Sequence, residues 1–191
     1  MDAKLVRVFG GTAFGLLALT ALCGSSAFAA EEVPPMERMA NSNGLLKEYG
    51  EKVTVTASSY WPGWEPTKAF DGNSETSWFT SSGDSAAKGA TPWIQVELPR
   101  GETVRRVTLL GNREPSWPTG FTIRKGKLEL LDADGKVLFE ETQTGEGDAC
   151  DFDFRPKGGI EGVRRIRFTS LEDDGGKTAF EDIALGEFQV E

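Results

Sequence analysis

The sequence predicts an all-β domain that begins near residue 51. Beyond that point, short runs of alternating or β-branched apolar residues recur, and clusters of Gly, Pro, Asp and Asn separate them. No amphipathic helix of useful length occurs in the same part of the sequence. Several short strands at regular spacing are typical of a β-sandwich or a β-barrel.

Eight segments have the pattern of strands, and a turn is clearest between the fourth and the fifth. There, Asp134-Gly135 separates two alternating runs, as in a β-hairpin. Asp132 and Asp134 also resemble the start of an EF-hand loop, but the later oxygen donors of that loop are missing, so we predict a turn. The eight segments, in order, are 51–57, 93–98, 104–110, 127–131, 137–142, 150–154, 163–169 and 183–190.

The N-terminal residues have the features of an export signal. Lys4 and Arg7 precede an apolar run at 8–22, and Ala27-Phe28-Ala29 has the small-x-small pattern of a signal-peptidase site. The apolar run is too short for a convincing membrane span. We therefore expect a signal peptide at 1–29 and a protein exported to the periplasm or the cell exterior.

A polar tether and a single folded domain are expected to follow. Residues 30–50 are rich in polar residues and contain Pro34-Pro35, with a short helical turn expected at 45–49. Residues 51–191 suit one domain with its own core. Cleavage would leave Cys150 as the last cysteine, next to an alternating Phe run, so we predict a buried thiol and no internal disulfide.

Composition argues against several classes of function. The formal net charge is −9, which disfavours broad contact with nucleic acid or an anionic membrane. The chain contains no histidine, the usual general base near neutral pH, and it has neither a nucleophile elbow nor a P-loop. Glycoside hydrolysis needs only two carboxylates, but the acidic residues fall mostly in turns or at alternating strand positions. We therefore predict a protein that is not an enzyme.

An oxygen-rich loop lies between the first two predicted strands. Asp71, Asn73 and Thr76 surround Gly72, and Trp78 follows them. Calcium prefers six to eight oxygen ligands, and a glycine allows the sharp turn that aims them. An exposed Asp-Gly turn has the same spacing, so the residues alone leave both interpretations open.

Tryptophans flanked by prolines suggest a ligand-binding surface. Trp61 and Trp64 lie in one predicted loop and Trp117 in another. A flat indole matches the C–H face of a sugar, and the nearby Glu65 and Arg113 offer planar hydrogen bonds to hydroxyl groups. The alternative is that these indoles fold back as a lid on the end of the domain. Trp78 and Trp93 adjoin strands and are both predicted to lie in the core.

Two motifs resemble the discoidin family, also called coagulation-factor F5/8 type C domains. These motifs are Ala69-Phe70-Asp71-Gly72-Asn73-x-x-Thr76-x-Trp78 and the final Gly186-Glu187-Phe188-Gln189-Val190. The resemblance extends over 53–191 and implies an eight-stranded jelly-roll β-sandwich of the galactose-binding-like fold.

The resemblance also implies a function. Arg113 is similar to the family's sugar-binding arginine, and Phe180 resembles an aromatic platform that some members use. A secreted, non-catalytic carbohydrate-binding module is the function implied, although galactose-binding members often use a histidine that is missing here. A protein-interaction domain or a lipid-adhesion domain is the alternative. Membrane binding is not favoured, because only Lys68 lies near Trp61 and Trp64.

The resemblance further implies a structural Ca²⁺ ion. Asp71, Asn73 and Thr76 match the family's calcium loop, and Glu187 matches its carboxylate on the last strand. Such an ion would join the last strand to the first loop and relieve the repulsion between two carboxylates.

Overall fold

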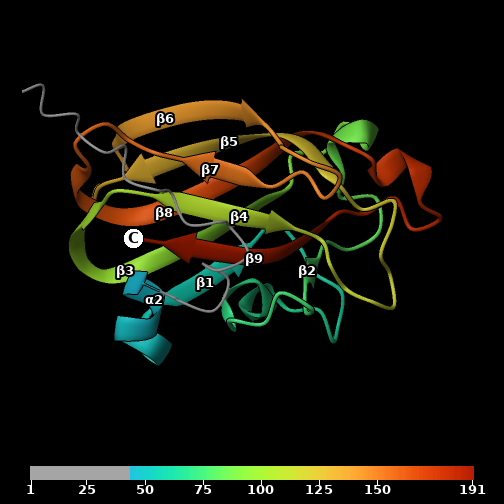
Figure 1. Ribbon diagram of the computed structural model, residues 1–191, viewed down its shortest axis with the longest axis horizontal. Coiled ribbons are helices and arrows are strands. Elements are labelled where there is room, and N and C mark those ends of the chain that lie inside the picture. Colours follow the sequence, from blue (N-terminus) through green and yellow to red (C-terminus); the bar gives the residue numbers. More distant parts are fainter. Residues whose placement is uncertain (1–43) are drawn as a thin grey trace, which may run out of the picture. The chain divides into compact units, whose positions relative to one another are not determined.

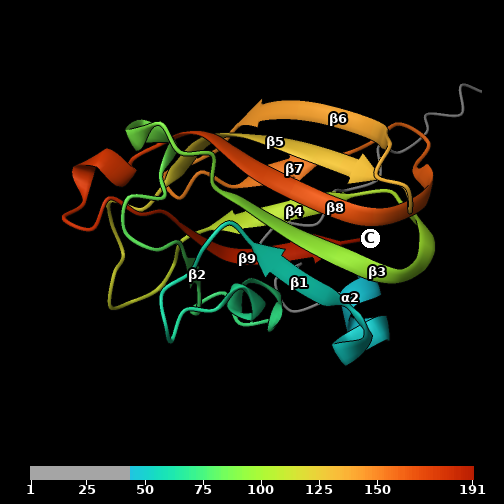
Figure 2. The same cartoon turned by 180° about the vertical axis from the view of Figure 1, so that it is seen from behind.

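The computed structural model describes residues 44–191, in which two antiparallel sheets pack face to face (Figures 1 and 2). The predicted signal peptide at 1–29 and the first part of the tether, 30–43, lie outside the described residues. The expected helical turn is present as α2 (Gly44–Tyr49), followed by a 3₁₀ turn at Gly50–Lys52. Leu46 on α2 is buried against the core. Within 44–191, no helix is long and apolar enough to cross a membrane.

The larger sheet has the strand order β1-β3-β8-β5-β6, and the smaller sheet has the order β2-β9-β4-β7. The strands are β1 (Thr54–Ala57), β2 (Trp78–Phe79), β3 (Trp93–Val104), β4 (Val107–Gly111), β5 (Ile123–Leu131), β6 (Val137–Thr144), β7 (Phe152–Phe154), β8 (Ile160–Asp173) and β9 (Ala184–Val190). This arrangement confirms the predicted all-β sandwich, and the strand count is close to that of a jelly roll.

All eight predicted strands are present, and β2 is an additional one. It contains two residues, Trp78 and Phe79, which pair with Leu185 and Ala184 of β9. So short a strand has no alternating pattern, which explains why the sequence did not reveal it. The expected turn between β5 and β6 is also present: the side chain of Asp132 accepts hydrogen bonds from the N–H groups of Asp134 and Lys136.

Four strands begin later than the sequence suggests: β1, β4, β7 and β9. The 3₁₀ turn at Gly50–Lys52 precedes β1, and the backbone also turns before β4 and β7. The chain crosses from one sheet to the other at Arg105 and Arg106, whose N–H groups both donate to the carbonyl of Glu191, so β4 begins at Val107. Cys150 has a φ of +57°, which places it in a turn ahead of β7. Its thiol is buried, as predicted, and accepts a hydrogen bond from Arg124.

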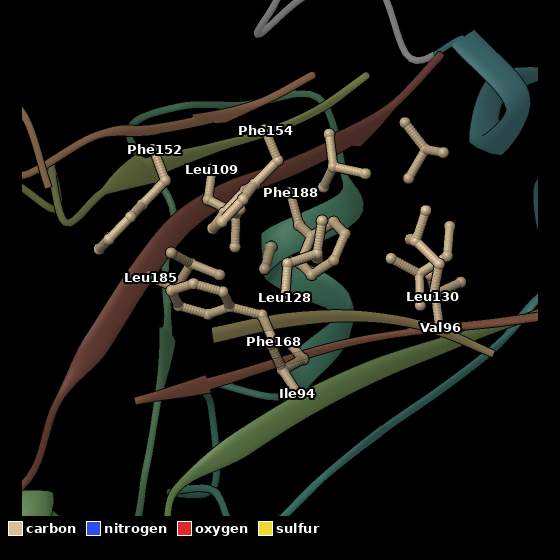
Figure 3. Close-up of a cluster of buried hydrophobic side chains, with 14 of the residues drawn as sticks. Ile94, Val96, Leu109, Leu128, Leu130, Phe152, Phe154, Phe168, Leu185 and Phe188 are labelled. Carbon is tan, nitrogen blue, oxygen red and sulfur yellow. The ribbon is translucent and has the colours of Figure 1, made fainter. Parts of the chain in front are cut away.

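The core lies between the two sheets, where large side chains from both layers meet (Figure 3). Phe152 and Phe154 of β7 contact Phe168 of β8 with ring centroids 5.0 and 6.2 Å apart. Trp78 belongs to this core, as predicted. The prediction for Trp93 is wrong: it alternates with the inward-facing Ile94 and lies half-buried on the outer face, under the guanidinium of Arg167.

Gly126 of β5 gives a test of core packing, because a Cβ there would lie 2.1 Å from the ring of Phe168. We expect Gly126→Ala to lower the free energy of unfolding by about 2 kcal/mol, as the ring must move within a filled core. Urea unfolding followed by circular dichroism measures the change. Gly176→Ala is the control, since its Cβ would meet only the methyl of Ala87 at 3.3 Å, and we expect a change within about 0.5 kcal/mol. Equal effects from both substitutions would contradict this account of the core.

Candidate functional site

Six aromatic side chains and one carboxyl group line a pocket of about 190 Å³ at one end of the sandwich. They come from three connections and one strand, which the fold brings together there. The connections β4–β5 and β8–β9 project at the same end, on the right of Figure 1. The lining residues are Trp61 and Trp64 before β2, Phe79 on β2, Trp117 and Phe121 between β4 and β5, and Phe180 and Asp182 between β8 and β9.

Backbone hydrogen bonds fix the segments that carry these rings. The N–H of Trp61 donates to the carbonyl of Phe79, and the N–H of Phe79 donates to the carbonyl of Trp64. The N–H of Ala184 donates to the carbonyl of Phe121 over 2.9 Å. The pocket is therefore built on paired backbone, and its rings are held before any ligand arrives.

The rings meet edge to face and form a continuous chain of contacts. In order, the contacts join Trp64 to Phe79, Phe79 to Phe121, Phe121 to Trp117, Trp117 to Phe180, and Phe180 to Trp61. Centroid distances run from 5.1 to 6.4 Å, and interplanar angles from 68° to 87°. Aromatic pairs favour such steep angles, and all six rings line the same pocket.

The pocket is open because two of its walls reach the surface. Trp117 is 41% exposed and Phe180 is 44% exposed, whereas Phe79 and Phe121 are buried beneath them. The alternative prediction, that the indoles fold back as a lid on the end of the domain, therefore holds only in part. Trp61 and Trp64 pack on the buried rings, while Trp117 and Phe180 remain accessible.

Asp182 is the polar member of the pocket lining, and its side chain is almost fully buried. The hydroxyl of Thr178 donates to its Oδ1 over 3.1 Å. Burial raises the pKa of Asp182, and hydrogen bonds from Thr178 and from the side chain of Trp61 oppose that rise.

Asn112 stabilises the loop that carries Trp117. Its side-chain amide donates to the carbonyl of Trp117, and its Oδ1 accepts from the hydroxyl of Ser77 and from the N–H of Glu114. The loop is thereby joined to the segment just before β2, which positions the exposed indole.

Two of the predicted ligand residues do not line the pocket. Arg113 pairs with Asp151 over 2.7 and 2.9 Å and also donates to the carbonyl of Gly111. Glu65 accepts the N–H of Gly63, and this hydrogen bond lowers the pKa of its carboxyl group. Arg113 and Glu65 thus form hydrogen bonds with the local backbone, and Arg113 also forms an ion pair. The four predicted aromatic residues, Trp61, Trp64, Trp117 and Phe180, all line the pocket.

The predicted metal residues also lie together, at the junction of the loop after Phe70 with β9. The side chain of Asp71 accepts the N–H of Asn73 and the hydroxyl of Thr76, each over 2.8 Å. Glu187 approaches from β9 and accepts the N–H of Gly72 through Oε1 over 3.3 Å. Among residues 44–191, no group of three or more His, Cys, Asp or Glu side chains is placed to hold a metal ion.

Glu187 is an unusual residue for the middle of a sheet. Its side chain is fully buried, and its Oε2 atom has no hydrogen-bond partner in the described part of the chain. Burial, together with the negative charge of Asp71, raises the pKa of Glu187 to about 8. A buried oxygen without a partner next to a second carboxylate is a site that a cation would satisfy.

Sequence reasoning missed three residues of the pocket: Phe79, Phe121 and Asp182. The signal for Phe79 was its position directly after Trp78, since neighbouring residues on a strand face opposite sides. Phe121 and Asp182 lie in irregular connections, where no periodic pattern assigns a side chain to a pocket.

The fold and this site define a galactose-binding-like β-sandwich with an aromatic pocket at its loop end. The F5/8 type C domain model matches residues 54–179, and the chain belongs to that family. A comparison with curated proteins finds no match.

Solved structures with the same fold include carbohydrate-binding domains. The family 32 CBM of NanJ from C. perfringens, solved in complex with galactose, is 19% identical with a TM-score of 0.56, covering 73% of this chain and 93% of that chain. The lectin domain of lectinolysin, solved with Lewis B antigen, is 16% identical with a TM-score of 0.56, covering 80% and 94%. Chitosan-binding module 1 of a Paenibacillus sp. IK-5 chitosanase/glucanase is 25% identical with a TM-score of 0.54, covering 73% and 95%.

Proposed function

We propose that this protein is an exported, non-catalytic carbohydrate-binding domain that holds a glycan in its aromatic pocket. The observation that carries the proposal is the gathering of Trp61, Trp64, Trp117 and Phe180 around one accessible pocket. Flat aromatic faces bind the C–H faces of sugar rings, and such a pocket needs little ordering on binding. Domains of the same fold were solved with galactose and with Lewis B antigen.

The volume of the pocket suits a single sugar residue or a terminal substituent. It holds about 190 Å³, below the about 300–1,000 Å³ of pockets that enclose drug-sized ligands. A chain end or a side branch is therefore the expected recognition element. Arg113 and Glu65 would then act on the ligand only indirectly, through the loops that they hold.

The proposal includes a structural Ca²⁺ ion between the loop after Phe70 and β9. Asp71 and Glu187 would supply its charged ligands, and Asn73 and Thr76 lie beside them. The unpartnered Oε2 atom of Glu187 supports this assignment. The ion would fix the loop to the sheet and would take no part in ligand chemistry.

Glycan binding is tested by titrating the purified protein with a panel of oligosaccharides and following tryptophan fluorescence. We expect one sugar class to give a saturable shift. We expect Trp117→Ala to weaken that binding at least about tenfold, because an exposed wall of the pocket is lost. Tyr60→Ala is the matched control: Tyr60 is 51% exposed but does not line the pocket, so affinity should stay unchanged.

A flat response to the whole panel, confirmed on a glycan array, would overturn glycan binding and favour a protein partner for the exposed rings. Binding that survives Trp117→Ala and Phe180→Ala together would place the glycan elsewhere on the molecule.

A further inference from the structure

The composition of the pocket lining is more specific than an apolar site requires. Six of its seven residues are aromatic, and Leu, Ile, Val and Met are missing from the lining of this pocket. The main core of the same domain uses aliphatic residues freely, including Leu109, Leu128 and Ile166. A pocket that bound a purely apolar group could be lined by aliphatic side chains as well as by aromatic ones.

Aromatic rings differ from aliphatic side chains in their electrostatics. Each ring presents a negative face, so several faces around one space attract a positive charge. The contacts from Trp64 to Trp61 place six rings around this space at steep mutual angles. Trimethylammonium groups are bound by cages of this kind, since their charge is spread over methyl groups that also require apolar contact.

The ionisable group of the pocket has the matching sign. Asp182 lines the pocket, and neither Lys nor Arg is among the seven lining residues. Asp182 is 2% exposed, so its charge would act through little water. A cation seated in the pocket would offset the desolvation of this carboxylate, and the net charge of −9 favours its approach.

We propose that the pocket binds a trimethylammonium group of the choline type, carried by a glycan substituent or presented as a free ligand. Trp61, Trp117 and Phe180 would form the outer cage, and Asp182 would provide the counter-charge at its base. The inference rests on the proposed function in that both place the ligand in the same pocket.

Two ligands of the same shape, one charged and one neutral, distinguish the contribution of charge to affinity from that of apolar contact. Choline and 3,3-dimethyl-1-butanol differ in a quaternary nitrogen that is replaced by carbon. Isothermal titration calorimetry of the purified protein, at about 0.15 M salt to screen distant charges, compares the two. We expect choline to bind at least about tenfold more tightly. Choline-substituted and unsubstituted forms of one polysaccharide then tell a glycan substituent from a free ligand.

Two variants test the named groups. Asp182→Asn keeps size and hydrogen bonding, and it should weaken choline at least about fivefold while leaving the neutral alcohol unchanged. Trp117→Leu keeps an apolar wall but removes a ring, and it should also weaken choline selectively. Thermal unfolding checks that both variants fold, and Phe180→Leu replaces Asp182→Asn if the latter does not.

Each outcome is decisive. Equal affinity for choline and the neutral alcohol would overturn the cation site and leave an apolar pocket. No choline binding, with a sugar still titrating the same tryptophans, would overturn this inference and leave the proposed function intact. Choline binding that neither variant affects would place the cation elsewhere and overturn it. Selective choline binding without any glycan response would support the inference and overturn the proposed function.

Discussion

Without divalent cations, we expect the free energy of unfolding to fall as pH rises from about 5 to about 8, and we expect excess Ca²⁺ to abolish this fall. Burial raises the pKa of Glu187 from 4.5 to about 8 in the folded chain. The folded state therefore keeps a proton that the unfolded state has lost, and stability drops by up to about 1.4 kcal/mol per pH unit in that window. Urea unfolding in EDTA at a series of pH values measures the slope.

Burial also raises the pKa of Asp182, which therefore acts in the same direction as Glu187. Carboxyl groups with a lowered pKa act in the opposite direction. The pKa of Asp153 and that of Asp174 are lowered, the former by Arg106 and Arg155 against its own burial and the latter chiefly by Arg124. Their contribution is present at neutral pH and is lost as pH falls through their folded pKa values. A loss of stability above about pH 5 is therefore specific to carboxyl groups with a raised pKa, and the Glu187→Gln variant separates the contribution of Glu187 from that of Asp182.

Calcium would offset this loss of stability by binding the ionised form of Glu187. At a concentration 100 times its dissociation constant, a ligand specific for the folded state adds about 2.7 kcal/mol. Glu187→Gln should remove both the pH slope and the response to Ca²⁺, because the amide neither titrates nor supplies a charged ligand. Glu75→Gln, an exposed change in the same loop, should retain both. If the free energy of unfolding of the unmodified protein does not change with pH in EDTA, the raised pKa of Glu187 is refuted. If it falls with pH but Ca²⁺ has no effect on the fall, only the metal site is refuted.

Replacing Asp151 should destabilise the protein more than the loss of an ordinary ion pair. The side chain is 10% exposed, and it accepts two hydrogen bonds from Arg113 and one from the N–H of Gly111. Asp151→Ala would leave a guanidinium and a buried N–H without these partners. We expect the free energy of unfolding to fall by about 3 kcal/mol, measured by urea unfolding.

A double-mutant cycle tests whether this loss comes from the pair. Asp151→Ala with Arg113→Ala should cost less than the sum of the single changes, by about 1–2 kcal/mol. Glu172→Ala breaks the exposed pair with Lys125 and should change stability by less than about 1 kcal/mol. Additive effects at positions 113 and 151 would show that the pair contributes no interaction energy. The ligand-binding role of Arg113 that the family resemblance implies would then be favoured.

Periodicity explains why the sequence predicts the sheets well. Burial alternates along β3 from Trp93 to Leu98 and along β5 from Gly126 to Leu131, and an alternating pattern is the direct consequence of side chains pointing to opposite faces. The alternation does not show which face of a strand points to the core, so the sequence pattern alone does not place Trp93 on the outer face.

The pocket was only partly predictable, since it is assembled from connections. Tryptophans beside prolines pointed to Trp61, Trp64 and Trp117, whereas Asp182 is defined as a pocket residue only by the approach of Thr178 and of the aromatic loops. For Arg113, the sequence predicted a ligand-binding role but did not reveal the partner of the side chain. Its position matched the family pattern, but the carboxylate that it contacts lies 38 residues further along the chain.

The position of β9 sets the order in which this molecule is able to fold. It is the last strand of the domain, but it lies between β2 and β4 within its sheet and carries Glu187. During synthesis, the smaller sheet would stay divided until this strand leaves the ribosome, because β2 and β4 each pair with β9 and not with each other. An incomplete chain is thus kept from closing early. If the protein is exported as proposed, this delay would keep the chain unfolded while it threads through a translocation channel, and the sandwich would form on the far side.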